Sequence, residues 1–174
     1  PQEATYHDAK ARRSPSRMEK GLDVEEPYGA WCLEAMDAHG GWVASATDLL
    51  RWAMVLNPNS KPTLLKAESM SKLVAKPSFP ATDNAIWYGW GWQVREVKKG
   101  SYNLWHTGSL PGTGSILVRR HDGLSWAILT NTNANLAGKS FATMIDGPIH
   151  KAVDQAMPLA QNDLFQSFGY KTAH

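Results

Sequence analysis

An Asp-Gly pair between two strand-like runs is the feature that most narrowly limits the folds open to this chain. Residues 115–119 and 124–130 are rich in apolar side chains, and His121-Asp122-Gly123 joins them. Asp-Gly favours the tight turn of a β-hairpin, so the two runs should be antiparallel neighbours. Residues 102–106 form another strand-like run, and residues 90–94 alternate Trp and Val with Gly and Gln. The sequence therefore predicts an antiparallel sheet of three or four strands.

Three amphipathic segments accompany these strands and predict helices. Ser45 followed by Asp48 is typical of a capped helix start, and residues 46–56 then carry apolar side chains at helical spacing until Asn57-Pro58-Asn59. Residues 64–75 and 140–156 show the same spacing, and Gly147-Pro148 is expected to kink or split the last helix. We therefore expect an α+β fold with the helices packed on one face of the sheet.

Length and composition fit one globular domain with polar ends. The chain has 174 residues, of which 43% are hydrophobic and 20% charged, which is enough for a single core. Residues 1–30 are polar with mixed charge and predict an extended arm with little regular structure. Residues 31–157 would form the single α+β domain, and residues 158–174 a weakly specified tail.

Charge and residue usage argue against several classes of partner and cofactor. The net charge of +2 is too small to indicate a nucleic acid or an anionic membrane as partner. No stretch approaches the roughly 18 apolar residues of a membrane span, and no signal peptide is recognisable, so the compartment stays unknown. The one cysteine, Cys32, has no internal partner, and the six histidines lack zinc spacing. We expect neither a metal nor a cofactor.

Four segments, in this order along the chain, carry a family resemblance. They are residues 40–49 (GGWVASATDL), 88–92 (YGWGW), 105–112 (WHTGSLPG) and 128–131 (ILTN). Together they resemble the β-lactamase and penicillin-binding-protein serine hydrolases, which include class C β-lactamases, D-Ala-D-Ala carboxypeptidases and esterases. The resemblance covers roughly residues 5–155. It implies the C-terminal part of a β-lactamase/transpeptidase-like fold, in a family whose members are often periplasmic or secreted.

The resemblance implies a role for each residue of the His-Thr-Gly strand. The backbone N–H of Ser109 would donate to an oxyanion, and His106, in the place of the family's lysine, would donate a hydrogen bond or add positive charge. Thr107 and Gly108 would bind substrate, the glycine by letting it approach the backbone, and Asn131 would be a carboxylate-binding amide. Plainer alternatives stay open: an ordinary strand residue at position 106, a turn glycine at 108 and a strand end at 131.

The family's nucleophile is missing from its expected place. In the family it lies in a Ser-x-x-Lys helix well before the Gly-Gly-Trp segment, and a Tyr-x-Asn loop supplies a second base. Ser69 and Lys72 have the Ser-x-x-Lys spacing, but they follow that segment on a peripheral predicted helix. We interpret this pair as a false positive.

The sequence therefore predicts the C-terminal portion of a serine hydrolase acting on esters, amides or D-amino-acid peptides through an acyl-enzyme. Whether this chain is itself an enzyme stays open, and we expect it to be inactive alone. Its partners would be a small-molecule ester, peptide or β-lactam and the missing N-terminal half or a second copy, since the run at 124–130 would present an unpaired edge. The alternatives are a non-catalytic binding module, which the eight tryptophans would suit, or a proteolytic remnant.

Overall fold

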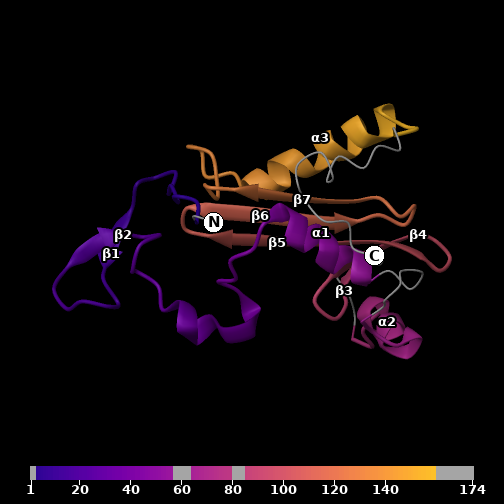
Figure 1. Cartoon of the computed structure of the whole chain (residues 1–174), viewed down its shortest axis with the longest axis horizontal. Coiled ribbons are helices and arrows are strands. Elements are labelled where there is room, and N and C mark those ends of the chain that lie inside the picture. Colours follow the sequence, from indigo (N-terminus) through magenta and orange to yellow (C-terminus); the bar gives the residue numbers. More distant parts are fainter. Residues whose placement is uncertain (1–2, 57–63, 80–84, 160–174) are drawn as a thin grey trace.

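A five-stranded antiparallel sheet forms the centre of the molecule (Figure 1). The computed structural model describes residues 3–56, 64–79 and 85–159. The strands lie in the order of the sequence: β3 (Ile86–Tyr88), β4 (Gln93–Lys98), β5 (Ser101–Leu110), β6 (Thr113–Arg119) and β7 (Ser125–Thr130). The predicted α+β class is confirmed, with one strand more than expected. β3 was missed because three residues are too few to show an alternation.

The first α-helix begins where the sequence predicted, and the second and third lie within their predicted ranges. In α1 (Ala46–Val55) the Ser45 hydroxyl accepts from the Asp48 backbone N–H at 3.1 Å, and the Asp48 carboxylate accepts from the Ser45 N–H at 3.2 Å. This reciprocal pair satisfies two donors of the first turn and confirms the predicted cap. A 3₁₀ segment, η1 (Leu33–His39), precedes it, and α2 (Ala67–Val74) follows.

The last helix, α3 (Phe141–Gln155), runs through Pro148 as one helix, so the predicted split is wrong. Gly147 and Pro148 are both exposed, and a side chain at Gly147 would meet no neighbour. The proline ring is therefore accommodated on the solvent side, and the missing N–H costs one backbone hydrogen bond without ending the helix.

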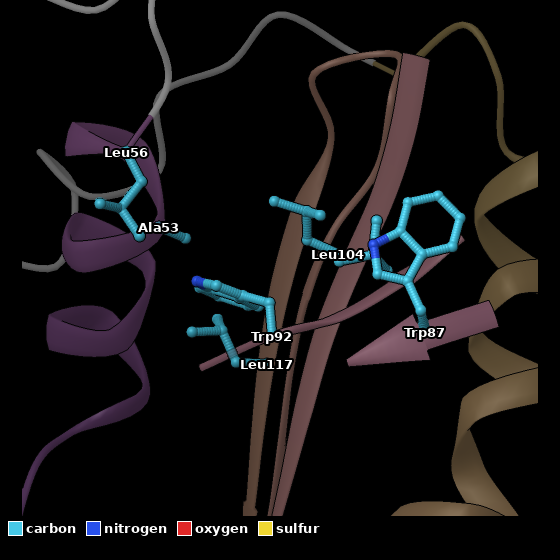
Figure 2. Packing of buried hydrophobic residues seen from close by; sticks show 7 residues of the cluster. Ala53, Leu56, Trp87, Trp92, Leu104 and Leu117 are labelled. Atoms are coloured by element: carbon cyan, nitrogen blue, oxygen red, sulfur yellow. The ribbon is translucent and has the colours of Figure 1, made fainter. Parts of the chain in front are cut away.

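Helices cover both faces of the sheet. On one face, Ala53 and Leu56 of α1 pack with Trp92, Leu104 and Leu117, as Figure 2 shows. On the other, Ala142 of α3 packs with buried Ile116 and Val118, and Trp105, Trp126, Ile128 and Ile145 pack around them. The expectation that helices lie on one face was therefore wrong. Ile116, Leu117 and Val118 are consecutive and all buried, which is the pattern of a strand covered on both sides.

The N-terminal segment contains a small hairpin rather than only extended chain. β1 (Arg13–Pro15) pairs antiparallel with β2 (Asp23–Glu25). Arg12 lies beside this hairpin and bridges Asp8 at 2.9 Å and Glu26 at 3.1 Å, which holds the segment together. The division of the chain at residues 30 and 157 stays a prediction.

Two predicted features lie outside the described residues. They are Asn57-Pro58-Asn59 and, within the predicted tail 158–174, the residues from 160 onward. Within the described ranges, no helix combines the length and the apolarity that a membrane crossing requires. β7 has β6 as its neighbour in the sheet and forms one of its two edges, as the sequence predicted.

Candidate functional site

The carboxyl half of β5 has a strand on one side only. β4 pairs with β5 from Ser101 to Trp105 and stops there, because Gln93 is the first residue of β4. β6 pairs with β5 from Leu104 to Leu110, the end of the strand. Among the described strands, residues 106–110 therefore have no partner on the β4 side. This free edge begins at His106 and contains the whole His-Thr-Gly segment.

The register determines which backbone groups of β5 point to the free edge. Leu110 and Thr113 flank the two-residue turn of the β5–β6 hairpin and form its closing hydrogen-bonded pair. Hydrogen-bonded and non-hydrogen-bonded pairs alternate along an antiparallel ladder. His106 and Gly108 therefore bond to β6, whereas the N–H and C=O groups of Thr107 and Ser109 point away from it. The structure thus leaves the Ser109 N–H directed to the free edge.

Side chains leave this segment on alternate faces of the sheet. His106 and Gly108 share the α1 face, where Gly108 lies opposite Ser115, and a Cβ at position 108 would clash with the Ser115 hydroxyl oxygen. Thr107 is half-buried and lies opposite Ile116. The absence of a side chain at Gly108 therefore leaves room for the Ser115 side chain on this face of the sheet.

His106 is held by Tyr88, a residue of the YGWGW segment that the sequence did not mark as part of the site. The Tyr88 hydroxyl lies 2.9 Å from His106 Nε2, and the two rings meet edge to face with centroids 5.8 Å apart. Tyr88 is the last residue of β3. The YGWGW segment was the available signal, but nothing in it identified a partner 18 residues away.

A tight turn fixes the position of Tyr88. The Gly89 N–H donates to the Trp92 carbonyl at 2.8 Å, and the Trp90 N–H donates to the Leu73 carbonyl at 3.2 Å. A Cβ at Gly89 would clash with that same Leu73 carbonyl oxygen. The turn is therefore anchored to the end of α2, and the buried Trp92 side chain anchors it to the core.

The other end of the free edge is closed by the N-terminal segment. The turn that follows Leu110 contains Gly112 with φ of +77°, a conformation that favours glycine. A Cβ at Gly112 would lie 2.7 Å from Pro27 Cγ and 2.9 Å from Tyr6 Cβ. The N-terminal segment therefore packs directly against this turn. A hydrogen bond to the Glu3 carboxylate raises the pKa of Tyr6 from 10.0 to about 12, so its hydroxyl stays protonated well above neutral pH.

Asn131 lies beyond β7 and contacts this same N-terminal segment. Its side-chain amide donates to the Thr5 carbonyl at 3.2 Å, and its backbone carbonyl accepts from the His7 N–H at 2.9 Å. These bonds give Asn131 a structural task in holding residues 5–7. The carboxylate-binding role implied for it stays a prediction.

Ser69 and Lys72 lie one turn apart on α2. Lys72 Nζ lies 2.8 Å from Glu68 Oε1, and among the described residues no hydrogen bond joins it to Ser69. The lysine is therefore directed to a carboxylate one turn away. The interpretation of the pair as a false positive stays a prediction.

Metal-ligating side chains do not cluster near the free edge. In the part of the chain that the structure describes, no group of three or more His, Cys, Asp and Glu side chains is arranged to hold a metal ion. Two surface hollows lie elsewhere, one beside Trp87 and Tyr102 and one beside Asp8 and Pro27. The free edge of β5, bounded by Tyr88 and by the turn at Gly112, is therefore the candidate site.

Comparison with known protein families supports a family assignment. The family model described as Beta-lactamase matches residues 1–145, which include the whole sheet and the start of α3. No curated protein and no solved structure gives a match.

Proposed function

The chain belongs to the Beta-lactamase family, and from that premise we propose that it forms the substrate-binding wall of a serine hydrolase. The substrate would be an ester, a β-lactam or another amide such as a D-amino-acid peptide. It would lie along the free edge of β5 and be cleaved through an acyl-enzyme. The nucleophile would come from a segment outside residues 1–174.

The observation that carries this proposal is the outward-directed N–H of Ser109. Acyl transfer places negative charge on the former carbonyl oxygen, and a fixed backbone donor stabilises it, by about 2.7–4 kcal/mol per donor in well-studied enzymes. Ser109 would supply one donor, and the nucleophile's own N–H would supply the other. The donor costs nothing in sheet stability, because this N–H takes no part in the ladder with β6.

The length of the free edge fits a short extended substrate. Residues 106–110 span about 13 Å at the usual rise of a strand. Thr107 and Ser109 each offer an N–H and a C=O, so a substrate added as an edge strand would form main-chain hydrogen bonds with two residues. That suits the scissile unit and one flanking unit of a small acyl donor rather than a long polypeptide.

His106 begins the free edge and would complete the wall. Its ring is exposed on the α1 face and is fixed by Tyr88. A histidine here can donate a hydrogen bond to a substrate carbonyl or carboxylate, as a lysine would do in other members of the family.

Two measurements on the isolated chain test the proposal. Incubation with a fluorescent penicillin and a chromogenic ester should give neither covalent label nor turnover, and a Ser69→Ala variant should behave identically. Labelling that the variant abolishes would show that the chain carries its own nucleophile and would overturn that part of the proposal. Titration with millimolar N-acetyl-D-alanyl-D-alanine should shift the amide resonances of Thr107 and Ser109, and unchanged resonances would contradict binding at this edge.

A second candidate function is a binding module without chemistry. Trp90 is 68% exposed and lies two residues from Tyr88, and Trp42 is 79% exposed. Exposed indoles suit the faces of sugars and of peptides. Peptidoglycan fragments that quench tryptophan fluorescence in the wild type but not in Trp90→Ala would favour this candidate. No change at millimolar ligand would count against it.

A further inference from the structure

We propose that Tyr88 is the positioning residue for His106 and that it makes Nδ1, rather than Nε2, the nitrogen that meets a bound substrate. The inference rests on the proposed function, because it assigns the working atom of the same site. It concerns a residue to which the sequence analysis gave no role.

The contact between the two side chains has the geometry of a specific hydrogen bond. The hydroxyl oxygen of Tyr88 lies 2.9 Å from His106 Nε2, and the rings make an interplanar angle of 68°. The oxygen therefore lies within the usual range for a hydrogen bond to nitrogen. Because Nε2 is engaged in this way, Nδ1 is the ring nitrogen left for another partner.

Tyr88 is held in place by its backbone rather than by its own exposed ring. Its side chain is 54% exposed, so packing alone would leave it several rotamers. Its strand, however, pairs with β4 at Gln93 and continues into the turn whose amides donate to Trp92 and to Leu73. The end of β3 is thus fixed beside the point where β4 stops pairing with β5.

The bond has a consequence for the protons of the imidazole. In neutral histidine one ring nitrogen carries the proton and the other accepts, whereas in the cation both donate. A phenol is a stronger donor than an imidazole N–H, and an imidazole nitrogen is a stronger acceptor than a phenol oxygen. We therefore expect the Tyr88 hydroxyl to donate to Nε2, and the neutral ring then carries its proton on Nδ1. When the ring is protonated, Nε2–H donates to the phenol oxygen and Nδ1 again carries a proton. In both charge states the site then presents an Nδ1–H donor to the substrate.

This arrangement explains how a histidine can stand where the family has a lysine. A lysine at this position is a donor at every protonation state that occurs near neutral pH. A histidine without a partner exchanges its proton between two nitrogens and offers an acceptor part of the time. A Tyr88 hydroxyl that donates to Nε2 removes that ambiguity, so His106 functions as a fixed donor and not as a general base.

The test is the tautomeric state of His106 in the isolated chain, read without any catalysis. With ¹⁵N-labelled histidine, long-range proton–nitrogen spectra distinguish a protonated ring nitrogen from a bare one, and a His106→Gln spectrum identifies the signals. In the neutral wild-type ring we expect a protonated Nδ1 and a bare Nε2. In Tyr88→Phe the two nitrogen resonances should move towards each other as the tautomers mix.

A matched control and the contrary results make the test decisive. Tyr102 lies against Trp87 and not against His106, so Tyr102→Phe should leave the His106 signals unchanged. A wild-type ring protonated at Nε2, or signals that Tyr88→Phe does not move, would overturn the inference. Adding N-acetyl-D-alanyl-D-alanine separates the two proposals. If the tautomer result holds but the dipeptide shifts neither Ser109 nor His106, the positioning role of Tyr88 stands and the proposed substrate site fails.

Discussion

Gln93 pairs with Trp105, and this is the pair at which the contact between β4 and β5 ends. The next residue of β5 is His106, and the chain before Gln93 is already in the turn that leads back to β3. The position of the turn between β3 and β4 therefore determines where β4 stops pairing with β5. A site that needs unpaired backbone donors obtains them here at the free edge of the sheet rather than inside the core.

The first prediction concerns the helices that cover the two faces of the sheet. Ile116 and Leu117 are neighbours in β6, yet they pack into different clusters on opposite faces. Ile116→Ala and Leu117→Ala should each destabilise the chain by about 2–5 kcal/mol in denaturant unfolding, because each leaves a cavity. Leu136→Ala, at a side chain that is 87% exposed, should change stability by less than about 0.5 kcal/mol. A large effect at only one of the two core positions would contradict cover on both faces.

The second prediction concerns the turn that places Tyr88. Gly89→Ala should destabilise the chain by about 1–3 kcal/mol, because the new Cβ meets the Leu73 carbonyl oxygen and the backbone must move. Gly147→Ala is the control: a Cβ there has open space around it, and its gain in helix propensity is offset by the restriction that Pro148 places on the preceding residue, so stability should change by less than about 0.5 kcal/mol. Urea unfolding of both variants gives the comparison. Equal effects of the two substitutions would argue against the close approach at Gly89.

The third prediction is a pH dependence in the N-terminal segment. Hydrogen bonds from Arg12 lower the pKa of Asp8 from 3.8 to about 2, and the Asp8 side chain is only 4% exposed. Because the folded pKa lies below the unfolded one, this pair stabilises the fold above about pH 4, and the contribution is lost as the pH falls through 2. Since Arg12 is half-exposed, the gain should not exceed about 1 kcal/mol.

Titration of the Asp8 carboxyl carbon by NMR checks this directly. The midpoint should lie near 2 in the wild type and rise towards 3.8 in Arg12→Gln. Arg13→Gln is the control, because Arg13 donates to the Asp23 carbonyl and does not touch Asp8. A wild-type midpoint near 3.8 would mean that the Asp8–Arg12 pair does not form.

Local signals predicted much of the fold. The Ser45–Asp48 box and the Asp122-Gly123 turn act over a few residues, so the start of α1 and the β6–β7 hairpin could be identified from sequence. β4 was predicted at residues 90–94 and lies at Gln93–Lys98. The alternation of Trp and Gly that suggested a strand at residues 90–94 lies instead in the turn between β3 and β4, where Gly91 has a φ of +77°.

Contacts between distant segments account for what the sequence did not predict. The bond from Asn131 to Thr5 joins residues 126 positions apart, and the Tyr88–His106 bond depends on where β4 ends. No periodicity or short motif encodes either distance. The sequence therefore identified the His-Thr-Gly strand, whereas its free edge and its tyrosine partner emerge only from the register of the sheet.

Amide hydrogen exchange along β5 tests the central claim most directly. The register predicts that the amides of Thr107 and Ser109 exchange rapidly with solvent, while those of His106, Gly108 and Leu110 are protected by their bonds to β6. Alternating protection over residues 106–110 in the isolated chain would support a free edge that offers the Ser109 N–H to a substrate. Protection at Ser109 equal to that at Gly108 would mean that another strand occupies this edge, and it would contradict the proposed site.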